Sequence, residues 1–211
     1  MIIVGVRPAR GHYMQLTLDT GNNVLIDKTT WEESPYGQDS SLSDEQLEAL
    51  ITASDHRRAT SRAVYLLSKR DLSRRELEQK LCREKGRYQP EKRELAAETA
   101  AKMQACGYIN DAAYAARLAE QYTYTRLYPK RRVVQALLQK GIDRDIAEQA
   151  VRDVCADDGK LALEFLRKKR YTVPKESKEF DRIAAAMARY GFTGEDIRRA
   201  MRRWMEETDF E

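Results

Sequence analysis

The sequence has few of the residues that interrupt helices, cross-link chains or bind metals. Its 211 residues include ten Gly, five Pro, three Cys and two His, which argues against low-complexity linkers. Cys82, Cys106 and Cys155 lack metal-ligand spacing, and three thiols cannot all pair within one chain. We therefore expect reduced cysteines in a cytoplasmic protein. No apolar run approaches the roughly 20 residues that a membrane helix needs, and the opening MIIVGVRPAR lacks the pattern of a signal peptide.

Recognisable catalytic chemistry is also scarce. The chain has no Gly-rich loop ending in Lys that would cradle a phosphate. His12 and His56 occur in unlike contexts far apart in the sequence, and the acidic pairs at 157–158 and 206–207 are best interpreted as solvated charge. The sequence thus predicts a non-enzymatic protein with no cofactor and no metal site, and an enzyme is the least favoured class.

Charge, by contrast, is abundant and unevenly distributed. Asp, Glu, Lys and Arg make up 34% of the chain and the mean hydropathy is −0.72, values typical of helices with one apolar stripe and wide polar faces. Residues 1–55 hold three Lys or Arg and nine Asp or Glu, a net charge of −6, whereas residues 56–211 hold 35 and 25, a net charge of +10. This asymmetry suggests that the basic body meets a polyanion or an acidic protein surface. The alternative is that both regions are simply solvated.

The first 42 residues have the composition of a small β unit. IIVGV, HYMQLTLD and VLID are short β-branched and aromatic runs, and TGNN at 20–23 separates the last two with residues that tolerate positive φ, which predicts a hairpin. Met14, Leu16 and Leu18 alternate with polar residues, as in a half-buried strand. Three short strands bury little surface alone, so we expect them to pack on the helices that follow.

Helical periodicity begins at residue 43. Ser43 with Gln46 forms a capping box, and the same pattern recurs at Ser73. Asn110 and Thr193 are expected to cap later helices, and Cys106 is expected on the apolar stripe of the helix that follows Pro90. We expect a connecting helix over 43–55, followed by a separate short helix over 59–66.

The helical part repeats a pattern of two helices, a glycine stop and a third helix. The stop glycines Gly86, Gly141 and Gly191 lie 55 and 50 residues apart, and Gly suits the left-handed conformation that often ends a helix. Neighbouring units of this size bury each other's apolar stripes. The sequence therefore predicts a mostly α fold in which the β-rich unit 1–42 and the helix 43–55 precede three tandem three-helix repeats at 56–109, 110–158 and 159–211.

Three basic stretches are candidates for a partner-binding surface. YTYTRLYPKRR (122–132) interleaves tyrosines with cations in what we expect to be a loop broken by Pro129, and its Tyr122 lies on a predicted core stripe. Aromatic rings stack on bases or fill protein pockets, and Arg forks bind carboxylate or phosphate. The alternative for each stretch is a plain solvated surface. The candidates are Arg126, Tyr128, Lys130, Arg131 and Arg132; Arg167, Lys168, Lys169 and Arg170; and Arg198 with Arg202.

Four phrases, in this order, carry a family resemblance. They are RAVYLLSKRDLSRRELEQKL (62–81), GYINDAAYAARLAEQ (107–121), RRVVQALLQKGIDRDIAEQAV and RYGFTGEDIRRAM. Together they resemble the RecX family, bacterial regulators of the RecA recombinase, over residues 10 to 204. Two departures are Asn110, where the family has Asp, and YPKRR (128–132), where the family usually has a Gly before the basic pair.

The resemblance implies a non-enzymatic regulator. Family members are built from three tandem three-helix repeats that form an elongated curved body, and longer members carry a small β-rich head. The resemblance implies that this chain binds the RecA filament and inhibits its ATPase, strand-exchange and SOS-related activities in homologous recombination and DNA repair. We expect a cytoplasmic monomer with no membrane partner. The alternative is a helical-repeat protein that binds single- or double-stranded DNA directly through a basic surface.

Overall fold

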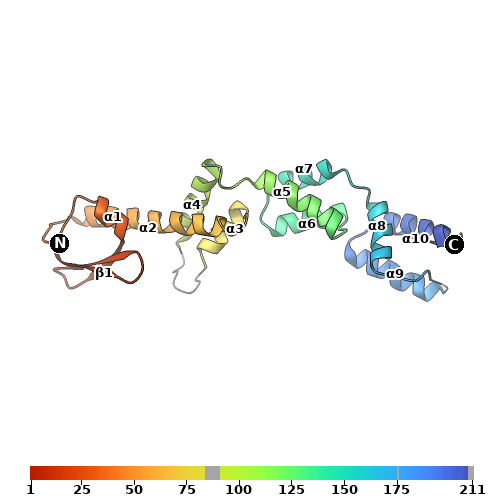
Figure 1. The fold of residues 1–211 in the computed structure, drawn as a ribbon, viewed down its shortest axis with the longest axis horizontal. Coiled ribbons are helices and arrows are strands. Elements are labelled where there is room, and N and C mark those ends of the chain that lie inside the picture. Colours follow the sequence, from red (N-terminus) through yellow and green to blue (C-terminus); the bar gives the residue numbers. More distant parts are fainter. Residues whose placement is uncertain (84–90, 175, 209–211) are drawn as a thin grey trace. The chain divides into compact units, whose positions relative to one another are not determined.

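A short β sheet begins the chain, and the regular elements that follow it in the described ranges are helices (Figure 1). The computed structural model describes residues 1–83, 91–174 and 176–208, so the predicted stop glycine Gly86 lies outside the described residues. The chain divides into two compact units, which consist of residues 1–71 with 77–108 and of residues 72–76 with 109–211.

The head is an antiparallel sheet whose strands are, in sheet order, β1 (Ile3–Ala9), β2 (Tyr13–Leu18) and β3 (Asn23–Asp27). Its register pairs Leu16 with Val6 on one side and with Val24 on the other. Gly21 has a φ of 82° in the tight turn between β2 and β3, a conformation that glycine adopts without steric strain. The predicted hairpin at 20–23 is confirmed.

The sheet packs on α1 (Lys28–Glu33) and on the first part of α2 (Asp44–Leu67). Alternate residues of a strand point to the same face, so Leu16 and Leu18 are buried while Thr17 between them is half-buried. Fully burying one such side chain contributes about 1.5–3 kcal/mol. The buried cluster that joins sheet and helix consists of Ile3, Leu16, Leu18, Ile26, Leu42, Leu47 and Leu50.

α2 is a single helix of 24 residues. Its N-terminus carries the predicted capping box, in which Ser43 and Gln46 exchange hydrogen bonds between side chain and backbone. The expectation of separate helices over 43–55 and 59–66 is wrong. Residues 44–67 contain neither Gly nor Pro, so nothing interrupts the ladder of backbone hydrogen bonds.

The rest of the first unit involves α3 (Arg74–Leu81) and α4 (Arg93–Ala105). Arg62 of α2 is only 5% exposed, and its guanidinium donates to the carbonyl oxygens of Lys80, Leu81 and Arg83 at 3.0, 3.0 and 2.6 Å. A helix leaves its last carbonyls unpaired and carries partial negative charge there, so a buried cation is stabilised at this end of α3. Cys106, expected on the apolar stripe of α4, is an exposed residue at its C-cap.

The second unit contains the remaining described helices. The predicted cap Asn110 accepts a hydrogen bond from the Ala113 N–H (2.9 Å), and Thr193 accepts one from the Asp196 N–H (3.2 Å). Both caps are therefore confirmed. The elements are α5 (Asp111–Glu120), the π-helical turn η1 (Gln121–Thr125), α6 (Lys130–Gln139), α7 (Arg144–Val154), α8 (Asp158–Lys168), α9 (Ser177–Tyr190) and α10 (Gly194–Thr208).

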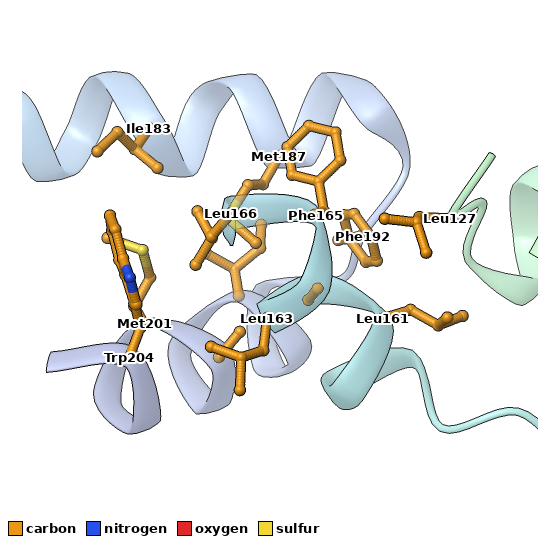
Figure 2. Packing of buried hydrophobic residues seen from close by; sticks show 13 residues of the cluster. Leu127, Leu161, Leu163, Phe165, Leu166, Ile183, Met187, Phe192, Met201 and Trp204 are labelled. Atoms are coloured by element: carbon orange, nitrogen blue, oxygen red, sulfur yellow. The ribbon is translucent and has the colours of Figure 1, made fainter. Parts of the chain in front are cut away.

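Each of the last two repeats has its own apolar core. Figure 2 shows the core of the third repeat, where Ile183 and Met187 of α9 lie across from Leu166 of α8 and Trp204 of α10. The core of the second repeat consists of Tyr114, Ala115, Ala119, Tyr122, Val133, Leu137, Ile142, Ala147, Ala150 and Val151. That of the third repeat consists of Leu127, Leu161, Ala162, Leu163, Phe165, Leu166, Ile183, Met187, Phe192, Ile197, Ala200, Met201 and Trp204.

Two joints of similar construction occur within the second unit, each at a stop glycine. Gly141 (φ 78°) follows α6 and lies against Arg75, so close that a Cβ added to it would be 2.5 Å from the Arg75 Cβ. Gly191 (φ 116°) follows α9 and lies against Arg132, where the same distance would be 3.3 Å. The absence of a side chain therefore permits both the backbone conformation and the close approach. We call these the Gly141 joint and the Gly191 joint.

The carbonyl just before each glycine accepts a hydrogen bond across its joint. The Ser73 hydroxyl donates to the Lys140 carbonyl, and the Arg132 guanidinium donates to the Tyr190 carbonyl at 2.7 Å. These bonds use carbonyls that the ends of α6 and α9 would otherwise leave unpaired.

A carboxylate also binds a helix N-terminus near each joint. Asp111 accepts a hydrogen bond from the Arg74 N–H (3.0 Å), and Asp158 accepts one from the Lys130 N–H (3.2 and 3.3 Å to its two oxygens). Negative charge is favoured at a helix N-terminus. Burial acts in the opposite direction and is the larger influence, so the pKa of both carboxyls is raised above the usual range.

Candidate partner-binding surface

The candidate surface is built around an irregular turn between α5 and α6. After Glu120 the backbone forms one π-helical turn, in which the Arg126 N–H donates to the Gln121 carbonyl at 3.4 Å. Leu127 then has a φ of 56°, and Pro129 occupies the N-cap of α6. Positive φ is a strained conformation for a bulky side chain, so Leu127 requires compensating contacts.

Those contacts come from the third repeat. Leu127 is only 4% exposed because its side chain packs into the core of that repeat (Figure 2). The Lys168 Nζ donates to the Thr125 carbonyl at 2.8 Å, and the Tyr190 hydroxyl donates to the Arg126 carbonyl. The turn therefore follows α5 in sequence but is held in place by α8 and α9.

Tyrosine rings and guanidinium groups pack together beside the turn. Arg132 lies between Tyr128 and Tyr190, with its guanidinium carbon 4.1 and 4.2 Å from the two ring centroids. Arg126 lies 5.0 Å from the Tyr122 centroid, and Tyr128 meets Tyr190 edge to face at 5.5 Å. Each cation–π contact contributes about 0.5–1 kcal/mol when exposed and more when desolvated. We call these five residues the tyrosine–arginine cluster.

A surface pocket of about 340 Å³ opens beside this cluster. Leu127 and Phe165, both 4% exposed, belong to its apolar lining. Arg126, Lys168 and Lys169 also line it, and all three are exposed. Within the described part of the chain, none of the three has a carboxylate oxygen within 4.0 Å. We call this feature the cationic pocket.

The charge state of the pocket is stable near neutral pH. A hydrogen bond with the Tyr128 side chain raises the pKa of Arg126, so its guanidinium stays protonated. Burial raises the pKa of Tyr190, so its hydroxyl stays a neutral donor. We therefore expect salt, rather than pH, to modulate binding at this surface.

The basic residues after Pro129 are not in a loop. Lys130, Arg131 and Arg132 form the first turn of α6, so the expectation of a loop is wrong, because Pro at a helix N-terminus initiates the helix. Lys130 and Arg131 are exposed and available to a partner. Arg132 is half-buried between two rings, so its side chain also stabilises the fold.

The stretch 167–170 is divided between different environments. Arg167 forms an ion pair with Glu207 of α10, and Arg170 lies beyond the end of α8 with a φ of 53°. Only Lys168 and Lys169 line the cationic pocket.

α10 presents a second basic surface. Arg199 pairs with Glu195 at 3.0 Å, and Arg203 lies 3.6 Å from Glu207. Arg198 and Arg202 are exposed, and no carboxylate oxygen in the described ranges lies within 4.0 Å of either. Like charges one helical turn apart cost a few tenths of a kcal/mol, so this pair is unfavourable for the isolated helix.

The arginines of the first unit are largely engaged inside it. Arg57 pairs with Glu33, and Arg58 pairs with the buried Glu91 at 2.8 Å. The hydrogen bond with Glu91 raises the pKa of Arg58 further above its usual range. Together with Arg62, these side chains stabilise the unit and are not free for a partner.

The first unit also has a pocket of about 520 Å³, lined by residues of the β1–β2 turn and of α2. Arg58 and Arg62 line it, and both are already occupied by the contacts above. Within the described ranges, no group of three or more His, Cys, Asp or Glu side chains is placed to hold a metal ion. No helix in those ranges is both long and apolar enough to span a bilayer.

Sequence reasoning missed three residues of the cationic pocket. Leu127 and Phe165 were not candidates because apolar side chains predict core packing, and Tyr190 lies 64 residues from Arg126. The sequence feature that could have identified Tyr190 is its position directly before the stop glycine Gly191. By the repeat pattern, that position matches Lys140, whose carbonyl also accepts a bond across a joint.

The fold and this surface define a tandem helical-repeat protein with a small β head and an exposed cationic surface. A profile described as RecX, second three-helix domain, matches residues 110–151. Regulatory protein RecX of Shigella boydii serotype 18 is 33% identical over 146 residues, which cover 66% of this chain and 87% of that protein. Its counterpart from Escherichia coli strain K12 is 32% identical over 155 residues, which cover 71% and 93%. The chain belongs to the RecX family of regulatory proteins.

Solved structures agree on the fold. The crystal structure of a regulatory protein RecX superposes with a TM-score of 0.66 at 21% identity and covers 94% of this chain and 98% of its own. RecX from Lactobacillus salivarius gives a TM-score of 0.58 at 21% identity and covers 72% and 97%. The predicted mostly α fold with an N-terminal β-rich unit is confirmed.

Proposed function

We propose that this chain is a non-enzymatic regulator that binds the filament of the RecA recombinase and inhibits its ATPase, strand-exchange and SOS-related activities. Membership in the RecX family of regulatory proteins carries this proposal. The cationic pocket and the exposed pair Arg198 and Arg202 support it, because both present positive charge that the described chain leaves without an acidic partner. An acidic or polyanionic partner would supply the missing charge.

Single exposed ion pairs contribute only about 0–1 kcal/mol each, so no one cation accounts for tight binding. The candidate cations are distributed over the α5–α6 turn, α8 and α10. A filament presents the same surface many times, and several weak contacts made together reach an affinity that none has alone.

The direct test is a titration of the RecA ATPase on single-stranded DNA. We expect the chain to lower the ATPase rate at amounts stoichiometric with RecA. An unchanged rate would contradict the proposal. Tight binding to DNA alone at physiological salt would favour the alternative, a protein whose main ligand is DNA.

A triple variant identifies the contact residues. Replacing Arg126, Lys130 and Arg131 by Ala removes exposed cations and retains Arg132, whose loss would disturb the fold. The variant should bind the filament more weakly, and its stability should fall by no more than the roughly 0.5–1 kcal/mol that the exposed Arg126 cation–π contact contributes. A matched control replaces three exposed cations of α9, namely Lys178, Arg182 and Arg189.

The salt dependence of filament binding shows whether these cations contact DNA phosphates or acidic side chains of RecA. If they meet DNA phosphates, each lost contact should flatten the slope of log K against log salt by about 0.9. If they meet acidic side chains of RecA, affinity should fall with only a modest change of slope, and binding to DNA alone should be unchanged. We expect the second result. If the triple variant binds the filament as tightly as the α9 control variant, Arg126, Lys130 and Arg131 do not contact the partner and are part of a plain solvated surface.

A further inference from the structure

The cationic pocket combines two features that an ordinary solvated surface lacks. Its cations come from separate elements, Arg126 from the turn after η1 and Lys168 with Lys169 from the end of α8, yet they converge on one site. Lys168 is anchored by its bond to the turn, so its charge has a defined position. Beneath these charges lie the buried side chains of Leu127 and Phe165. A ligand that fits must therefore offer negative charge and an apolar group together.

The aromatic rings here are poorly placed to stack on a base. Tyr190 has Arg132 at 4.2 Å and Phe165 at 4.4 Å from its centroid, and Tyr128 has Arg132 at 4.1 Å and Tyr122 at 5.7 Å. Proteins that bind single-stranded nucleic acids use open aromatic faces as stacking platforms. Because these faces are occupied by other side chains, the pocket favours a peptide side chain over a nucleobase.

We infer that the cationic pocket receives a short peptide segment of a protein partner, in which acidic residues flank one large apolar residue. The carboxylates pair with Arg126, Lys168 and Lys169, and the apolar side chain covers Leu127 and Phe165. Arg126 offers a fork for one carboxylate, while the two lysines act as point charges. This inference rests on the proposed function, since the filament is the partner in which we expect the segment, but it can be tested without the filament.

The turn that lines the pocket is held by contacts from several elements. Packing in the third-repeat core holds Leu127 at its positive φ, and Lys168 and Tyr190 hold the carbonyls of the turn. A preorganised site loses little conformational entropy when a ligand binds. Burial of a single apolar side chain should therefore contribute measurably to affinity.

The experiment uses the whole chain and a fluorescein-labelled peptide of sequence Glu-Glu-Phe-Glu-Glu, with binding followed by fluorescence anisotropy. A second peptide carries Ala in place of Phe. The pocket variant combines Arg126→Gln with Lys169→Gln, and the matched control combines Lys178→Gln with Arg182→Gln, which removes the same charge from exposed positions of α9. Melting curves establish that both variants are folded.

We expect the Phe peptide to bind about tenfold more tightly than the Ala peptide, because burial of an aromatic side chain contributes roughly that factor or more. The pocket variant should lose about tenfold in affinity for the Phe peptide, while the control should stay within about twofold of the wild type. Replacing Lys169 with Arg instead of Gln should preserve most of the binding.

Equal affinity for the two peptides, or equal losses in both variants, would mean nonspecific charge attraction and would overturn the inference. Oligo-dT serves as a competitor of the labelled peptide. If it displaces the peptide, and if its own binding depends on Arg126 and Lys169, the inference is also overturned, in favour of a nucleic-acid ligand. A chain that inhibits RecA but binds neither peptide refutes the pocket assignment alone. Peptide binding without any effect on RecA refutes the proposed function and leaves the pocket assignment standing.

Discussion

The Gly141 joint and the Gly191 joint occupy matching positions in the second and third repeats, but different side chains surround them. At the Gly141 joint the contacts are polar: Glu76 accepts a hydrogen bond from the Lys140 Nζ at 3.0 Å and another from the Tyr114 hydroxyl at 3.3 Å. Arg75, which covers the glycine, is itself exposed.

At the Gly191 joint the covering arginine is part of an aromatic cluster. Arg132 lies between Tyr128 and Tyr190, and the same rings line the cationic pocket. The comparison teaches that the repeat imposes a backbone requirement, a glycine beneath an arginine stem, while the surrounding side chains can differ. At the Gly191 joint, the surrounding tyrosine rings also line the candidate binding surface.

The largest effect is expected from adding a methyl group at the tighter joint. In Gly141→Ala the new Cβ would be 2.5 Å from the Arg75 Cβ, and left-handed backbone alone costs about 1–2 kcal/mol for a residue with a Cβ. We expect the free energy of unfolding to fall by about 2–4 kcal/mol in urea denaturation. Gly191→Ala should cost less, because its nearest contacts are at 3.3 Å. If it costs more, the φ of 116°, rather than the contact with arginine, decides stability at these joints.

A smaller effect is expected from removing the two arginines. Arg132→Ala removes contacts with two rings and a hydrogen bond to the Tyr190 carbonyl, so it should cost about 1–3 kcal/mol. Arg75→Ala removes an exposed side chain that covers Gly141 with its methylene groups, and should cost about 1 kcal/mol or less. Thermal denaturation of both variants gives the comparison. Equal losses of stability in the two variants would show that the tyrosine–arginine cluster adds nothing to the stability of the Gly191 joint.

The smallest effect is expected from pH. Burial raises the pKa of Asp158, so the folded chain binds this proton more readily than the unfolded chain, and this carboxyl favours folding increasingly as pH falls through the raised value. Measured in urea, the stability of the wild type relative to Asp158→Asn should therefore be higher at pH 4 than at pH 7. Asp111→Asn should behave in the same way. The opposite trend would mean that the bond to the helix N-terminus outweighs burial.

Signals that act over a few residues made most of the helical fold predictable. The capping box at Ser43, the cap at Asn110 and the stop at Gly141 each depend on atoms within one helical turn, and all three are found as predicted. The continuity of α2 was missed, although residues 44–67 contain no helix breaker. The capping box favours a helix over 43–55 and the apolar spacing favours one over 59–66, but neither signal indicates that the two segments are continuous.

The candidate site was predictable only in part. Arg126, Tyr128, Lys168 and Lys169 were identified from charge and aromatic content, and they do line one pocket. Tyr190 was not identified, since nothing local relates it to a turn 64 residues earlier.

Arg131 and Arg132 mark the boundary between what the sequence determined and what tertiary structure decided. The two arginines are adjacent and chemically identical, and the sequence alone determined that both belong to a basic, aromatic-rich segment before an apolar stripe. Contact between the end of α9 and the first turn of α6 decided that Arg132 lies between two tyrosine rings, one of them 58 residues away, while Arg131 faces solvent. An apolar stripe specifies that a helix buries one face, but only the packed helices determine which distant side chain meets it.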